Sequence, residues 1–229
     1  MKKPWFYLGD KSPDYLSLFE GGGRLELQDR QIDLDSAVLA EQVHGDHVHI
    51  CGEEDFGAGF EGREKITGAD GLITAIPNQY LMIRTADCYP VLIFDPEGGV
   101  VCALHSGREG TRLNITGKAI NMLKEEFGCD PAKLCAYIGA GVCGEHYQVS
   151  EELYEEFVAD VRAQGFAHRA PHRLLNLRMV VFQQLINSGI TFYNIENIQE
   201  CTFENQSYFS YRRDKANNRQ INIIGIIDE

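Results

Sequence analysis

The sequence lacks an apolar run long enough to cross a membrane as a helix, which takes about 18 residues or more. It also lacks a secretory signal, because residues 1–6 are not followed by an apolar stretch and a small-residue cleavage site. We therefore expect no membrane partner and a cytoplasmic location.

Basic residues are fewer than acidic ones. The chain has 21 Lys and Arg against 34 Asp and Glu, which gives a formal net charge of −13. A nucleic-acid-binding surface needs clustered Lys and Arg to contact phosphates. The composition therefore argues against a nucleic-acid partner, and Arg212-Arg213 is the local basic spot worth noting.

Closely paired cysteines are absent as well. The cysteines are scattered and odd in number: Cys51, Cys88, Cys102, Cys129, Cys135, Cys143 and Cys201. This pattern fits free thiols in a reducing compartment better than a disulfide framework. Cys102, Cys129 and Cys135 lie in or beside apolar runs, so we expect them to be small core residues.

The composition is that of a globular protein, since 44% of the 229 residues are hydrophobic and 24% are charged. Strand patterns dominate the first half of the chain, and helices alternate with strands in the second half. We predict one mixed α+β domain over residues 1–229. The oligomeric state is not indicated by any pattern in the sequence.

The expected strands have alternating or continuous apolar patterns bounded by turn residues. They cover residues 16–19, 24–28, 36–44, 46–51, 70–74, 80–84, 134–138, 191–198 and 220–227, besides two central runs on either side of a turn at 95–99. Apolar stripes at helical spacing indicate helices over residues 119–127, 153–161 and 174–185. Gly128 and Gly189 are the expected stops, Ser150 is an expected N-cap, and Gly21–Gly23 is an expected turn.

The two central runs carry the most informative pair of side chains. Cys88 begins the first run and His105 ends the second, so a hairpin would place them together at one rim of a sheet. A thiolate and an imidazole are transition-metal ligands, and His44 is the best third candidate. Two His and one Cys leave a fourth position open, as a catalytic zinc requires, and zinc can bring the pKa of a bound water near neutrality. The plainer alternative is a buried thiol with two hydrogen-bonded histidines.

Three further side chains are candidates for chemistry. Asp87 precedes Cys88, so on an extended chain it points to the opposite face; it could support a ligand or, if the chain turns, act as a general base. The alternative for Asp87 is a carboxylate that caps backbone N–H groups. Arg212 and Arg213 lie among aromatic residues at 208–214, where they could pair with phosphate beside a stacked base. The alternative there is an edge strand with solvated arginines.

Read together and in order, these segments resemble the YfiH-like family, whose members are identified as polyphenol oxidases (laccases) or as zinc-dependent purine nucleoside phosphorylases that also deaminate adenosine. The resemblance runs from about Ala40 to Gly225. Its motifs are Gln42-Val43-His44-Gly45, Ala69-Asp70-Gly71-Leu72-Ile73-Thr74, Thr85-Ala86-Asp87-Cys88-Tyr89-Pro90-Val91, Ala103-Leu104-His105-Ser106-Gly107, Ile138-Gly139 with Tyr147-Gln148-Val149, Cys201-Thr202, and Phe209-Ser210-Tyr211-Arg212-Arg213-Asp214.

The resemblance implies that His44, Cys88 and His105 are the metal ligands. It also implies mixed sheets packed centrally with helices outside. The implied activity is phosphorolysis of purine nucleosides (adenosine, inosine, guanosine, methylthioadenosine), in which phosphate held by Arg212 or Arg213 attacks the ribose C1′. Deamination of adenosine at the same zinc site is the implied second activity.

Two other functions stay open. A copper-dependent polyphenol oxidase could hold one copper on the same Cys and two His, but multicopper catalysis draws on many histidines in paired motifs and this chain has seven, dispersed. A metal-stabilised nucleoside-binding protein without turnover is the third hypothesis.

The chain departs from the family's pattern at three places. Arg108-Glu109 follows Gly107, where the family has Trp and then Arg or Lys. Glu145-His146 stands where the family's Gly-rich turn continues with a Cys pair. Phe19 stands where an N-terminal motif has Arg, and Arg24 and Arg108 are the two candidates to replace that charge.

Overall fold

The two central apolar runs form the hairpin that the sequence predicts. In the computed structural model, which describes residues 2–19, 23–27, 30–60, 62–97 and 99–228, β8 (Tyr89–Asp95) pairs antiparallel with β9 (Val100–Ser106). The register sets Tyr89 opposite Ser106 and Pro90 opposite His105. The start of β8 and the end of β9 therefore lie at the same rim of the sheet.

This hairpin is the centre of a mixed sheet with the strand order β11-β10-β8-β9-β6-β5. The other members are β5 (Val48–Ile50), β6 (Gly71–Thr74), β10 (Cys135–Ile138) and β11 (Ile195–Asn197). The outer pairs β5·β6 and β10·β11 are parallel, and the inner pairs are antiparallel.

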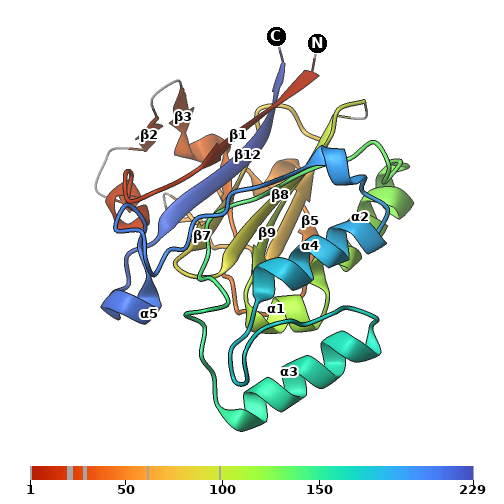
Figure 1. Ribbon diagram of the computed structural model, residues 1–229. Coiled ribbons are helices and arrows are strands. Elements are labelled where there is room, and N and C mark those ends of the chain that lie inside the picture. The colour runs from red at the N-terminus through yellow and green to blue at the C-terminus, as the bar shows by residue number, and fades with distance from the viewer. Residues whose placement is uncertain (1, 20–22, 28–29, 61, 98, 229) are drawn as a thin grey trace.

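A second sheet packs against the first, with the order β1-β12-β7-β4. Its strands are β1 (Lys2–Leu8), β4 (Ala37–Leu39), β7 (Tyr80–Thr85) and β12 (Gln220–Asp228), and the small hairpin of β2 (Arg24–Glu26) and β3 (Gln31–Asp33) lies beside it. β1 pairs with β12 along the whole length of β1 (Figure 1).

Alternation along β8 and β9 divides the core. Leu92 and Ala103 point into the layer between the two sheets, where they meet residues such as Ile224 of β12. Val91 and Leu104 point the other way, into the layer beneath the helices. Each such side chain is fully buried, and burial of one contributes roughly 1.5–3 kcal/mol. The hairpin is therefore held rigidly from both faces.

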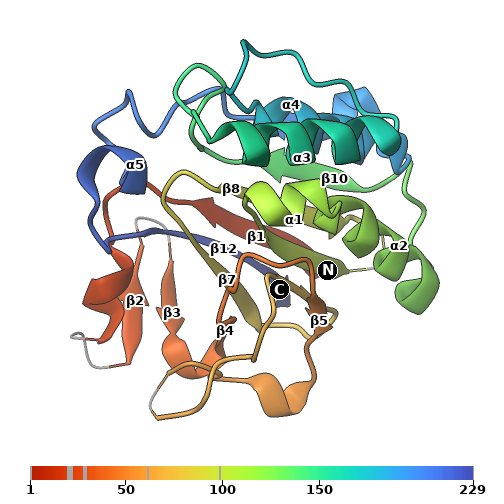
Figure 2. The same ribbon diagram turned by 90° about the horizontal axis from the view of Figure 1, so that it is seen from below.

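Helices cover the outer face of the larger sheet (Figure 2). They are α1 (Arg108–Arg112), α2 (Ile115–Phe127), α3 (Glu151–Ala163) and α4 (Leu177–Asn187), while the short α5 (Tyr211–Asp214) lies apart from them. As expected, α2 ends at Gly128, which has φ 70°, and the Ser150 side chain accepts a hydrogen bond from the Leu153 N–H at the start of α3. None of the helices in the described part of the chain is both long and apolar enough to span a membrane.

The predicted α+β class, with mixed sheets in the centre and helices outside, is confirmed. Cys102 and Cys129 are core residues as expected, whereas Cys135 is only partly buried. The expected turn at Gly21–Gly23 lies largely outside the described residues, which include Gly23 alone.

Three predicted strands, and the strand weighed as an alternative at 208–214, differ from the observed structure. Residues 15–19 form a 3-10 turn, and the expected strand at 191–198 is a 3-10 turn followed by the short β11. The segment 208–214 is not an edge strand: the Ser210 hydroxyl accepts from the Arg213 N–H and begins α5. The strand expected at 36–44 ends at Leu39, because a buried carboxylate, described below, holds the following loop.

Candidate metal centre

The structure brings the three predicted ligands together. The ligand atoms of His44, Cys88 and His105 all lie within 4.8 Å of one another. His105 is on β9 and Cys88 immediately precedes β8, as the hairpin register requires. His44 comes from the loop between β4 and β5, and its ring lies edge-on to that of His105 with 4.8 Å between the ring centroids. His105 is buried and His44 is exposed, so the group opens to solvent on one side.

A fully buried carboxylate organises this group from behind. Asp70 Oδ1 lies 2.7 Å from His105 Nδ1, which leaves the other ring nitrogen for a metal. The same carboxylate accepts the backbone N–H groups of the His44 loop, from Val43 at 3.0 Å, His44 at 3.0 Å and Gly45 at 2.7 Å. Asp70 therefore fixes two of the three ligands, one through its ring and one through its backbone.

The protonation states of the group suit a metal cation. Burial raises the pKa of the Cys88 thiol, but the imidazoles of His105 and His44 outweigh it and hold that pKa below its ordinary value. Burial lowers the pKa of His105, but Cys88 and Asp70 outweigh it and raise that pKa above its ordinary value. The pair thus favours a thiolate beside a positive charge, and a metal ion can supply that charge in place of the proton.

Backbone strain concentrates around the ligands. Gln42, His44 and Asp87 have φ values of 58°, 65° and 92°, in a region that residues other than glycine rarely adopt. The Gln42 amide helps to hold this conformation, since it donates to the Arg84 carbonyl at 2.8 Å and accepts the Arg84 N–H at 2.9 Å. Gly107 leaves room beside the ligands for a different reason: a Cβ there would lie 3.1 Å from Cys88 Sγ and would press on the thiol.

The ligands lie in a pocket of about 750 Å³. Its lining carries the cationic side chains Arg84, Arg108, Arg212, Lys215 and Arg219, opposed by the carboxylates Asp87 and Glu109. In a chain with a net charge of −13, this excess of cations is local to the pocket. Clefts lined by one sign of charge concentrate ligands of the other sign, so the pocket favours an anionic substrate.

Asp87 lies in the pocket with Cys88, because the chain bends at residues 86–88 rather than running extended. Its carboxylate accepts the Thr202 hydroxyl at 2.7 Å and the Arg212 N–H at 2.7 Å. The capping alternative weighed for Asp87 therefore describes its contacts in this structure. Through those contacts Asp87 positions the first turn of α5.

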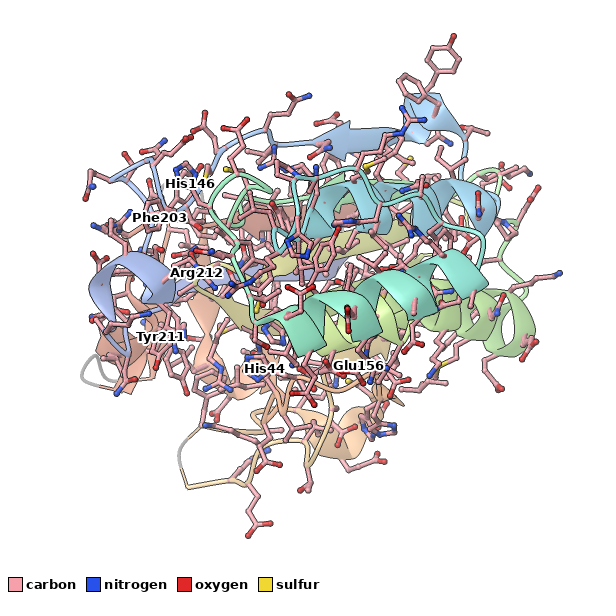
Figure 3. All side chains as sticks on the ribbon, turned by 60° about the horizontal axis from the view of Figure 1, so that its bottom comes forward. His44, His146, Glu156, Phe203, Tyr211 and Arg212 are labelled. Carbon is pink, nitrogen blue, oxygen red and sulfur yellow. The ribbon has the colours of Figure 1, made fainter. Side chains whose placement is uncertain are left out.

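The two adjacent arginines have different surroundings. The Arg212 guanidinium lines the pocket and lies 4.8 Å above the centre of the Tyr147 ring; it forms no hydrogen bond or ion pair with the described residues. Figure 3 shows Arg212 on the same side of the molecule as Tyr211 and His44. The Arg213 guanidinium is absent from the pocket lining and instead donates to the carbonyls of Thr202 at 2.6 Å and Tyr208 at 2.8 Å. Only Arg212 is placed to meet a ligand.

Comparison with known proteins gives the family. A family model described as multi-copper polyphenol oxidoreductase laccase matches residues 22–227. The chain belongs to this family. A purine nucleoside phosphorylase of Corynebacterium glutamicum is 30% identical, over 85% of this chain and 76% of the relative. A purine nucleoside phosphorylase of Streptomyces coelicolor is 34% identical, over 85% of this chain and 77% of the relative.

A solved structure supports the same assignment. The hypothetical protein YfiH of Bacillus licheniformis matches with a TM-score of 0.77 and 30% identity, covering 86% of this chain and 76% of the other. The resemblance to the YfiH-like family is thus confirmed.

The departures from the family's motifs can now be placed. Arg108, which follows Gly107, lines the pocket, where its guanidinium pairs with Glu109 at 3.0 Å. Arg24 pairs with Asp33 on the β2–β3 hairpin and does not line the pocket. Of the two candidates to replace the charge of the family's N-terminal arginine, Arg108 lines the pocket and Arg24 does not.

Two residues important to this pocket were not singled out from the sequence. Asp70 was part of a motif, but the signal that marks it is chemical: a carboxylate at the start of an entirely buried strand must find donors. Tyr147 was also part of a motif, but its contact could not be read from the sequence, because it depends on Arg212, which lies far along the chain from it.

Proposed function

We propose that this protein is a zinc-dependent purine nucleoside phosphorylase. The observation that carries the proposal is the combination of a Cys and two His donor groups with a cationic pocket wall in an acidic protein. The names of the Corynebacterium and Streptomyces relatives support the substrate class. The substrates are then a purine nucleoside and inorganic phosphate.

The donor set fits zinc. One thiolate and two imidazoles are ligands that zinc accepts, and three protein ligands leave one position for substrate. A bound zinc ion would supply a Lewis acid that polarises a substrate oxygen. The copper alternative is less well supported, because none of the potential ligand groups among the described residues joins more than two of the seven histidines.

Arg212 is the proposed phosphate ligand. Its planar guanidinium can donate two parallel hydrogen bonds to phosphate oxygens, and the Tyr147 ring beneath it restricts its orientation. Asp87 holds the backbone of Arg212, and Arg213 binds the loop carbonyls of the neighbouring segment. We assign both of these residues a positioning role.

The reaction is a displacement at the ribose. A phosphate oxygen forms a bond to C1′ while the bond from C1′ to the purine nitrogen breaks, and the released purine takes up one proton. The protein's contribution is to hold phosphate on the side of the ribose opposite the purine, which converts a meeting of two solutes into a reaction within one complex. Deamination of adenosine in the same pocket is the second activity that we propose to test.

The decisive assay compares adenosine turnover with and without phosphate. Zinc-replete protein should release adenine and ribose 1-phosphate only when phosphate is present. Any deaminase activity should appear as inosine without phosphate, and as inosine or hypoxanthine with phosphate. Bound zinc and copper should be quantified in the same preparation. Oxygen-dependent phenol oxidation by a copper-loaded protein, with no nucleoside product, would replace the proposal by the oxidase. Nucleoside binding without any product would favour the binding protein.

Replacing Arg212 with alanine should raise the KM for phosphate by about 10- to 100-fold, because a charge-assisted hydrogen bond contributes roughly 1.5–3 kcal/mol. The KM for nucleoside should change much less. Steady-state kinetics at varied phosphate measures this effect. Arg24→Ala is the matched control, since Arg24 is exposed and lies outside the pocket lining. An unchanged phosphate KM in Arg212→Ala would remove Arg212 from the site.

A further inference from the structure

A second group of side chains that could hold a metal ion lies outside the pocket lining. Cys143 and His146 belong to one tight turn, closed by a hydrogen bond from the His146 N–H to the Cys143 carbonyl at 3.1 Å. Cys201 and Glu204 belong to another, closed by the Asn205 N–H and the Cys201 carbonyl at 2.9 Å. In each turn two residues separate the two potential ligands, a spacing common in structural zinc sites.

The side chains of the two turns converge on one point. His146 Nδ1 lies 3.1 Å from Cys143 Sγ, 3.9 Å from Cys201 Sγ and 3.5 Å from Glu204 Oε1. All four ligand atoms lie within 4.8 Å of one another. Tetrahedral zinc with ordinary bond lengths separates its ligand atoms by about 3.3–3.8 Å. The three distances from His146 Nδ1 bracket that range and the remaining ones are at most 4.8 Å, so shifts of about 1 Å would let the four atoms enclose an ion.

We propose that Cys143, His146, Cys201 and Glu204 bind a structural zinc ion, separate from the metal centre in the pocket. The two groups share no ligand. Two thiolates, an imidazole and a carboxylate fill all four positions of tetrahedral zinc, which leaves no open position for a substrate. The site is therefore structural rather than catalytic.

The surroundings of the two turns support a thiolate-bound cation. The Cys143 N–H donates to Cys201 Sγ at 3.2 Å, a contact that stabilises negative charge on sulfur. The Phe203 ring stacks on the His146 ring at 4.7 Å between centroids, which fixes the direction of Nδ1 (Figure 3). Cys201 is buried while Glu204 is exposed, so an ion can enter from the solvent side.

The proposed zinc ion would connect two walls of the pocket. Tyr147, which lies beneath Arg212, follows His146 directly. Thr202, whose hydroxyl binds Asp87, follows Cys201 directly. The protein backbone already links the turns by the bridge between Gly141 and Cys201. Joining the two turns through a metal would therefore restrict the side chains on which Asp87 and Arg212 depend.

Zinc content of the full-length protein tests the proposal. Protein should be purified under reducing conditions, supplied with zinc, freed of excess metal and measured by plasma mass spectrometry. Wild-type protein should hold about two zinc ions per chain, Cys88→Ala about one, and Cys88→Ala/Cys143→Ser about none. A double variant that retains the zinc of Cys88→Ala would overturn the proposal. A Cys88→Ala protein that binds no zinc would also overturn the proposal, whether its Cys143 and Cys201 are free thiols or are joined in a disulfide.

Exposed glutamates give a variant pair that should leave folding unchanged. In the Cys88→Ala background, Glu204→Gln should weaken zinc binding at the second site about tenfold or more. Glu145→Gln makes the same charge change in the same region but removes no ligand, so its affinity should stay at the Cys88→Ala value. Competition with a chromophoric chelator measures both affinities. Equal affinities for the two variants would exclude Glu204 as a ligand. Because the test is made without Cys88, its outcome does not depend on the proposed phosphorylase activity.

Discussion

Replacing Cys88 with alanine should remove about one zinc ion per chain and lower phosphorolysis at least about 10³-fold. The variant loses the thiolate of the pocket's ligand group and leaves two imidazoles, one of them on an exposed loop. Two neutral ligands hold zinc poorly, and without the ion several kcal/mol of charge stabilisation are lost. The measurements are zinc content and the initial rate of adenine release at saturating phosphate.

Cys135→Ala is the matched control for this result. Cys135 is a partly buried thiol on β10 and does not line the pocket. Its variant should keep the zinc content and the rate of the wild-type protein. If Cys88→Ala also keeps both, Cys88 is not a metal ligand and the proposed function loses its chemical basis.

Replacing Asp70 with asparagine should destabilise the protein by about 3–5 kcal/mol and weaken zinc binding in the pocket about 10- to 100-fold. The Asp70 carboxylate accepts hydrogen bonds from the N–H groups of Val43, His44 and Gly45. It also faces His105 Nδ1, which can act as a donor. An asparagine of nearly the same volume turns an NH₂ group toward some of these donors, and no water can replace the lost acceptor in so buried a position. Urea unfolding of zinc-stripped protein measures the loss of stability, and competition with a chelator measures the loss of zinc affinity.

Asp95→Asn provides the comparison. Asp95 is also buried, but among the described residues its side chain accepts one backbone hydrogen bond, from the Glu97 N–H at 2.8 Å, in the β8–β9 turn at the opposite end of the hairpin. We expect a loss of about 1 kcal/mol and no change in zinc affinity. If Asp70→Asn and Asp95→Asn lose the same stability and the same zinc affinity, Asp70 has no special role in the metal centre.

The sequence predicted the part of the site that depends on a hairpin. Cys88 and His105 are close because two apolar runs and a short turn leave few alternatives to antiparallel pairing, and pairing determines which ends meet. The helices α2 and α3 were predictable for a similar reason. Their apolar stripes and end residues are local signals, read without knowledge of the fold.

The geometry around His44 could not be predicted by local rules. Its segment has the alternating pattern of a strand, yet the loop adopts positive φ at Gln42 and His44 because hydrogen bonds to Asp70 and Arg84 compensate the strain. Those partners lie 26 and 42 residues further along the chain. The convergence of Cys143 and Cys201 escaped prediction likewise, because it depends on how loops between distant strands meet.

The Asp70 carboxylate has a consequence for the energetics of metal capture. Since it ties the His44 loop to β9 through hydrogen bonds, it restricts how far the ligands can move relative to one another. The apparent affinity for a metal equals the intrinsic affinity when most molecules hold the binding-competent arrangement. When only a fraction of the molecules hold it, the apparent affinity is lower by that fraction. Little chain entropy then remains to be lost when the ion arrives. Selection among metals then depends on the donor atoms and their spacing.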